Sequence, residues 1–73
     1  MELLMVEVFK TNVRQKRQAK MLLCRLLEQF PSFRINFDLE DCDKVLRIEA
    51  TQVCIETTIK LLNSHGFECE VLI

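Results

Sequence analysis

Four cysteines and one histidine are the side chains in this chain best suited to binding a metal or attacking a substrate. The cysteines are widely spaced, with at least eleven residues between any two of them: Cys24, Cys42, Cys54 and Cys69. Thiol pairs that bind zinc or exchange disulfides are usually separated by only about two to four residues. We therefore expect these thiols to stay reduced and to act as small apolar or surface side chains.

His65 and Cys42 are the one combination that could hold a soft metal, provided that the fold brings them together. A zinc site needs three or four protein ligands, so Asp41 or Asp43 would have to complete the set. Alternatively, His65 precedes a glycine and contacts the last carbonyls of a helix. We favour this second interpretation and expect no bound metal or other cofactor.

The sequence offers little for catalysis. It has no serine–histidine or cysteine–histidine pattern with an orienting acid, and its single glycine, Gly66, excludes a glycine-rich phosphate loop. The carboxylates fall in expected turns and strands instead of pairing in a cleft. We expect that the protein is not an enzyme.

A cluster of basic residues is the strongest candidate for a binding site: Lys10, Arg14, Lys16, Arg17 and Lys20. If a helix begins here, each exposed cation opposes the helix dipole by about 0.3–1 kcal/mol. Such a surface suits an anion or an acidic protein partner. The competing interpretation is that a neighbouring acidic segment neutralises the cluster through Asp38, Glu40, Asp41 and Asp43.

Alternating polarity and helical periodicity predict the elements that position these residues. Residues 3–9 alternate as a strand, with Leu4, Val6 and Val8 on one face and Met5, Glu7 and Phe9 on the other. Asn12 and Gln15 then suggest a capping box for a helix over about residues 13–29, which the proline at position 31 ends. Residues 33–39 and 44–50 predict a hairpin across a short acidic turn.

The remaining segment predicts a second helix and a last strand. Thr51 is placed to cap this helix, its apolar stripe is Ile55, Ile59 and Leu62, and Gly66 ends it in the left-handed conformation. Residues 67–73 alternate again as a strand.

The whole chain, residues 1–73, therefore predicts one α+β ferredoxin-like domain. Its four-stranded antiparallel sheet has the order 4-1-3-2 and carries both helices on one face. The first strand–helix turn, the hairpin and the turn before the last strand meet at one end, which we call the pole. The open face of the sheet is expected to show Glu7, Phe9, Arg34, Asn36, Asp38, Arg47, Glu49, Glu68 and Glu70.

Read in this order, residues 6–71 resemble the heavy-metal-associated domain family of copper chaperones and metal-pumping ATPases. Residues 10–15, Lys-Thr-Asn-Val-Arg-Gln, stand where that family has Met-Thr-Cys-x-x-Cys, and Gly66-Phe67 matches its second signature. The resemblance implies the family fold, with a partner docking at basic residues beside the first turn. However, Asn12 and Gln15 replace the two cysteines, and neutral amides are poor ligands for Cu(I). The metal-binding motif is lost.

We therefore expect a cytoplasmic interaction or regulatory module that binds an acidic protein surface. An atypical Cu or Zn carrier is the alternative, and a weak homodimer through a sheet edge is possible beside a monomer. Nucleic acid is not expected, because RNA-binding domains of this topology need exposed aromatics on the central strands, and an acidic open face repels phosphate. The short acidic apolar start, 1–7, lacks the features of a signal or membrane segment, and the net charge is −1.

Overall fold

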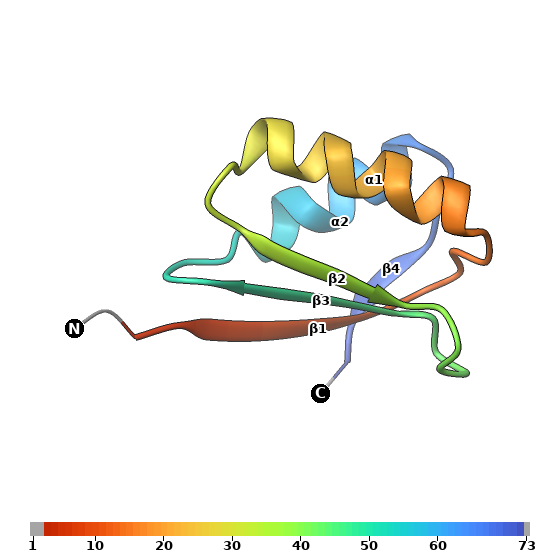
Figure 1. Ribbon diagram of the computed structural model, residues 1–73, viewed down its shortest axis with the longest axis horizontal. Helices are drawn as coiled ribbons and strands as arrows, with labels where there is room; N and C mark the ends of the chain where they lie inside the picture. Colours follow the sequence, from red (N-terminus) through yellow and green to blue (C-terminus); the bar gives the residue numbers. More distant parts are fainter. Residues whose placement is uncertain (1–2, 73) are drawn as a thin grey trace.

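The computed structural model describes residues 3–72, which form a sheet with both helices packed on one of its faces (Figure 1). The elements, in chain order, are β1 (Met5–Thr11), α1 (Lys16–Gln29), β2 (Arg34–Asp38), β3 (Val45–Ala50), α2 (Ile55–Ser64) and β4 (Cys69–Val71). This confirms the predicted α+β, ferredoxin-like order of elements.

All strand pairs are antiparallel, and the strand order is β2-β3-β1-β4. Counted from the β4 edge, this is the predicted order 4-1-3-2. The two edges therefore belong to β2 and β4. The pairing of β4 covers only the second half of β1, from Phe9 to Thr11.

The core lies between the sheet and the two helices. On α1 the buried residues Ala19, Leu22 and Leu26 follow helical spacing, and on β3 the buried residues alternate along the strand. Within residues 3–72, eight side chains are almost completely shielded from solvent: Phe9, Val13, Leu22, Leu26, Leu46, Ile48, Thr58 and Leu62. Each of the large apolar ones contributes about 1.5–3 kcal/mol by leaving water.

The expected orientation of β1 is wrong. Phe9 is fully buried against the helices, and Glu7 shares its face because it pairs with the buried Ile48. Leu4 and Val6, expected inside, remain 54% and 45% exposed. Val6 and Val8 pair with Glu49 and Arg47 on the opposite face, which neither helix covers, so this apolar set lies on the open side of the sheet (Figure 1). The open face therefore lacks both Glu7 and Phe9.

Both predicted helix caps are also wrong. α1 begins at Lys16, with Gln15 in the N-cap position but making no side-chain capping bond. The segment before it stays non-helical because the Thr11 hydroxyl accepts a bond from the Val13 N–H, and Val13 enters the core. α2 begins at Ile55 with Cys54 in the N-cap position, three residues later along the chain than a cap at Thr51 implies.

The predicted end of α2 is confirmed. Gly66 has φ +87°, its N–H donates to the Asn63 carbonyl, and the Phe67 N–H donates to the Leu62 carbonyl. These two bonds make up a Schellman motif, in which glycine takes the left-handed position. Within residues 3–72, neither helix is long and apolar enough to cross a membrane.

Candidate functional site

Three segments distant in sequence are bonded together at the pole. The Thr11 N–H donates to the Asp43 carbonyl at 3.1 Å, and the Thr11 hydroxyl donates to the Lys44 carbonyl. On the other side, the Asn12 Oδ1 accepts a bond of 2.8 Å from the Glu68 N–H. The structure thus joins the first strand–helix turn, the hairpin and the turn before β4, as the topology predicted.

The basic surface, defined as Lys10, Arg14, Lys16, Arg17 and Lys20, lies at this pole and along the first turns of α1. All five side chains belong to exposed residues. Lys10 approaches Asp43, with 3.9 Å between Nζ and Oδ1. Within residues 3–72 the other four make no ion pair. The hairpin acids therefore contact the cluster at one lysine and leave most of it unpaired.

The start of α1 adds positive potential to this surface. The first turn contains no acidic residue, and no side chain of the described residues, 3–72, caps it. Gln15 instead directs its Oε1 to the Arg17 guanidinium, at 3.4 Å. Because a helix N-terminus carries a partial positive charge, its amides and the basic side chains favour the same ligand, a negatively charged group.

Asn12 and Gln15, the two residues of the expected capping box, both make intramolecular hydrogen bonds. Asn12 ties the first turn to the segment before β4, and Gln15 bonds to Arg17. Asn12 therefore helps to fix the pole, a role that local sequence could not show because Glu68 lies 56 residues away.

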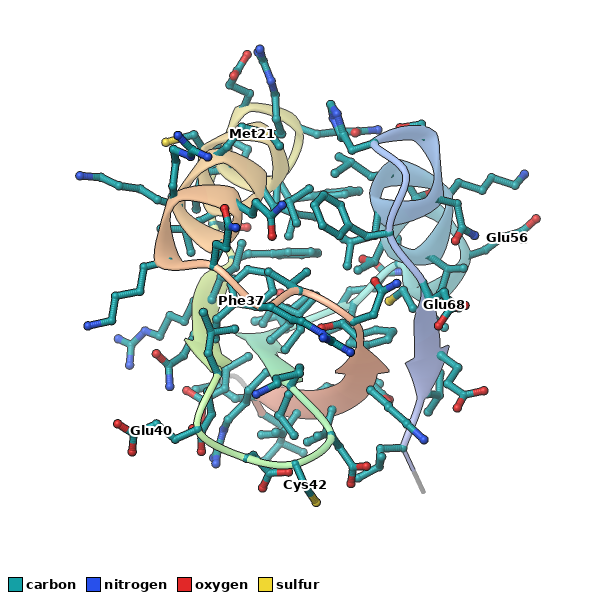
Figure 2. All side chains as sticks on the ribbon, turned by 90° about the vertical axis from the view of Figure 1, so that its right-hand side faces the viewer. Met21, Phe37, Glu40, Cys42, Glu56 and Glu68 are labelled. Carbon is teal, nitrogen blue, oxygen red and sulfur yellow. The ribbon has the colours of Figure 1, made fainter. Side chains whose placement is uncertain are left out.

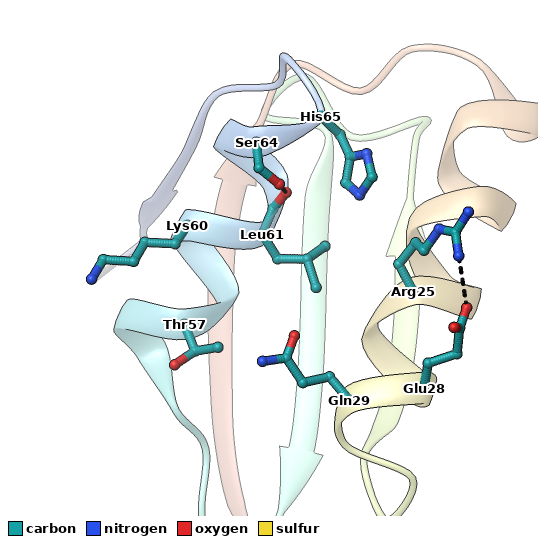
Figure 3. Close-up of a pocket in the computed structure, with 8 residues that line it drawn as sticks. All are labelled: Arg25, Glu28, Gln29, Thr57, Lys60, Leu61, Ser64 and His65. Atoms are coloured by element: carbon teal, nitrogen blue, oxygen red, sulfur yellow. Dashed lines mark hydrogen bonds and ion pairs between the residues drawn. The ribbon is translucent and has the colours of Figure 1, made fainter.

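Cys42 and His65 do not enter one ligand group. Cys42 lies in the hairpin with Asp41 and Asp43, and the ligand atoms of these three residues are within 4.8 Å of one another. His65 instead lines a groove of about 540 Å³ between α1 and α2, beside Arg25 and Leu61 (Figure 3). The hairpin group thus offers two carboxylates and one thiol, without the histidine.

The free thiols differ in environment. Cys24, Cys42 and Cys54 belong to exposed residues, whereas Cys69 on β4 is partly buried. Burial, with a smaller contribution from the charge of Glu70, raises the pKa of the Cys69 thiol from 9.0 to about 12. Since the thiolate is the nucleophile, Cys69 is suited to packing and poorly suited to catalysis.

A second surface feature was not anticipated from the sequence. Two adjoining hollows, of about 280 and 180 Å³, run between α1 and β2 and share Ala19 and Phe37 as lining residues. These hollows depend on how far α1 extends over the edge of the sheet, and the periodicity of apolar residues in the sequence does not show this.

Neither a protein-family model nor a curated protein sequence matches this chain.

Proposed function

We propose that this chain is a non-enzymatic interaction module, similar in design to heavy-metal-associated domains, that binds an acidic protein through its basic surface in the reducing cytoplasm. The observation that carries the proposal is the group Arg14, Lys16, Arg17 and Lys20, exposed at an uncapped helix start and without ion pairs within residues 3–72.

Energetics support a binding role for this arrangement. Exposed cations near a helix N-terminus oppose the dipole, whereas a bound carboxylate relieves the repulsion and uses the free amides. Arginine guanidinium groups at Arg14 and Arg17 can also bind carboxylates in a bidentate manner. The net charge of −1 keeps the attraction local, so an acidic partner is drawn to this surface and not to the whole molecule.

The test is affinity capture of protein partners with the full chain. The double variant Arg14→Glu/Arg17→Glu should lose at least nine-tenths of the captured partner. The matched control Arg25→Glu/Lys60→Glu makes the same change in net charge away from the basic surface and should capture normally. Equal capture by the first variant and the wild type, with both folded by circular dichroism, contradicts the proposal.

An atypical Cu or Zn carrier is a second candidate, favoured by the grouping of Asp41, Cys42 and Asp43. We rank it lower because both carboxylates already have partners: Asp41 Oδ1 accepts the Asp43 N–H at 2.9 Å, and Asp43 approaches Lys10. Carboxylates are also hard ligands that suit Cu(I) poorly.

Native mass spectrometry of the reduced protein with equimolar Cu(I) or Zn(II) separates the two candidates. We expect no metal adduct that survives a weak chelator. An adduct lost in Cys42→Ser would establish the carrier function instead.

A further inference from the structure

The groove between α1 and β2, built from the two adjoining hollows, has an apolar floor. Ala19 and Leu23 line it from the helix, and Ile35 and Phe37 line it from the strand. Figure 1 shows α1 running over β2, and Figure 2 shows Phe37 on the strand beneath that helix. Partly buried apolar side chains thus lie directly beside the edge of the sheet.

The backbone direction of β2 follows from a chain of pairings. In a strand, the N–H and C=O of one residue point to the same edge, and successive residues alternate. The Leu72 N–H donates to the Val8 carbonyl, so Val8 points toward β4 and its neighbour Phe9 points toward β3. The partner of Phe9 on β3 is Leu46, which therefore points back toward β1.

The same alternation reaches the outer edge. Because Leu46 points toward β1, Arg47 on β3 points toward β2, where its partner is Asn36. Asn36 consequently points inward, and its neighbours Ile35 and Phe37 point away from the sheet. Because β2 is an edge strand, the N–H and C=O of these two residues pair with no other strand within residues 3–72.

Free edge groups and an apolar floor occur at the same two residues. The outward backbone of Ile35 and Phe37 can pair with an added strand, and their side chains, with Leu23, can pack against every second residue of that strand. This is the arrangement by which extended peptides extend a sheet: backbone bonds supply affinity, and alternate pockets supply selectivity.

Charge around the groove indicates which peptide fits. Lys20 lines the part beside Ile35, and Lys16 lines the part near the hairpin, where Asp38 and Glu40 also lie. Lys20 is exposed and has no ion pair within residues 3–72. An acidic residue in the ligand is therefore favoured beside Lys20 and disfavoured at the hairpin end.

We infer that the groove binds an extended acidic–apolar peptide segment of the partner, which adds to β2 as a fifth strand and places a carboxylate beside Lys20. This inference rests on the proposed function, because Lys16 and Lys20 belong to the basic surface.

The test is an NMR titration of the isotope-labelled full chain with a blocked peptide of four alternating valine and isoleucine residues followed by two aspartates. The amide signals of Ile35 and Phe37 should shift and become protected from hydrogen exchange. A peptide N-methylated on the amides that would bond to β2 should not bind.

The variant Lys20→Glu should weaken peptide binding at least tenfold, whereas the matched control Lys60→Glu should change it less than twofold.

Other outcomes contradict the inference. If the amide shifts are confined to Arg14 and Arg17 and are equal for the unmodified and the N-methylated peptide, the peptide does not add to β2 as a strand. The proposed binding of an acidic partner at the basic surface would then still stand. Protection of Ile35 and Phe37 that grows with protein concentration alone would make a second copy the occupant. If no amide signal shifts, the groove does not bind such a peptide and the inference is wrong. The capture experiment would still test the proposed function separately.

Discussion

At the residue scale, Thr11 joins the parts of the pole. The residue is only 6% exposed, and its hydroxyl makes two hydrogen bonds, as donor to the Lys44 carbonyl and as acceptor from the Val13 N–H. Its backbone N–H also reaches Asp43. One residue thus fixes the hairpin relative to the turn that carries Arg14.

We expect Thr11→Val to lower the free energy of unfolding by about 1–3 kcal/mol, because it leaves the Val13 N–H and the Lys44 carbonyl without their partner. Urea denaturation checks this. Thr11→Ser keeps the hydroxyl and should recover most of the loss. A valine variant as stable as the wild type would show that water replaces both bonds.

Cys69 should be the least reactive of the four thiols. Raising a pKa from 9.0 to about 12 lowers the thiolate fraction at pH 8 by about a thousandfold. With iodoacetamide at pH 8, we expect Cys69 to be alkylated at least a hundredfold more slowly than Cys24 or Cys42, as read by mass spectrometry of peptides. Equal rates would mean that β4 opens readily.

The same pKa gives a stability dependence with a definite sign. The unfolded thiol ionises near pH 9.0, whereas the folded one keeps its proton to about 12. Its contribution to stability is complete below pH 9 and is lost as the pH rises toward 12. Urea midpoints should therefore fall more steeply with pH in this range for the wild type than for Cys69→Ala.

The role of a residue could be predicted from the sequence where it depends only on the pattern of its own helix or strand. The exposure of Lys16, Arg17 and Lys20 follows from helical spacing, because Ala19, Leu22 and Leu26 occupy the buried face of α1. The role of Asn12 was not predictable, since its partner Glu68 is brought near only by the complete fold. The separation of Cys42 from His65 depends on the complete fold, which places His65 in the groove between the helices and Cys42 beside Asp41 and Asp43.

At the element scale, helix ends show which local signals decide structure. Gly66 ended α2 as predicted, since only glycine takes a positive φ at little cost. The helix N-caps predicted at Asn12 and Thr51 were wrong, because the N-caps are Gln15 and Cys54. In the first case the buried side chain of Val13 determines where the chain turns, and burial outweighs a capping bond of about 1 kcal/mol.

We expect Gly66→Ala to destabilise the domain by about 1–2 kcal/mol, because the residue has φ +87°. A Cβ at this position meets no atom within 4 Å, so the cost comes from backbone strain alone. Gly66→Asn should therefore cost less, as asparagine tolerates this conformation better. Thermal denaturation measures both, and an alanine variant without loss would argue against the Schellman geometry.

The predicted orientation of β1 was wrong because of how the strand and the helices pack. Leu4, Val6 and Val8 form the more apolar alternating set, which normally marks the buried face. Burial nevertheless depends on which face the helices cover, and Phe9 shares the covered face with Leu46 and Ile48, so Val6 and Val8 lie on the open face. Alternating polarity distinguishes the two faces of a strand, but it does not tell which of them the helices cover.

At the scale of the whole molecule, the order of elements and the hairpin were enough to predict the sheet order and the pole. Right-handed crossovers leave few alternatives for this order. The groove beside β2 could not be predicted, because it depends on the lateral placement of α1 over the edge strand. In the described residues, the exposed basic surface therefore adjoins the apolar groove beside the edge strand β2.

The central claim is that the start of α1 contacts an acidic protein. The most direct measurement is site-specific photo-cross-linking in the native host, with the photoreactive residue replacing the exposed Gln15, and replacing the exposed Gln52 as the control position. We expect one dominant adduct from position 15 that is absent at position 52 and is lost when Arg14 and Arg17 become glutamate. An adduct of equal yield at both positions, or one unaffected by the charge reversal, would contradict the account.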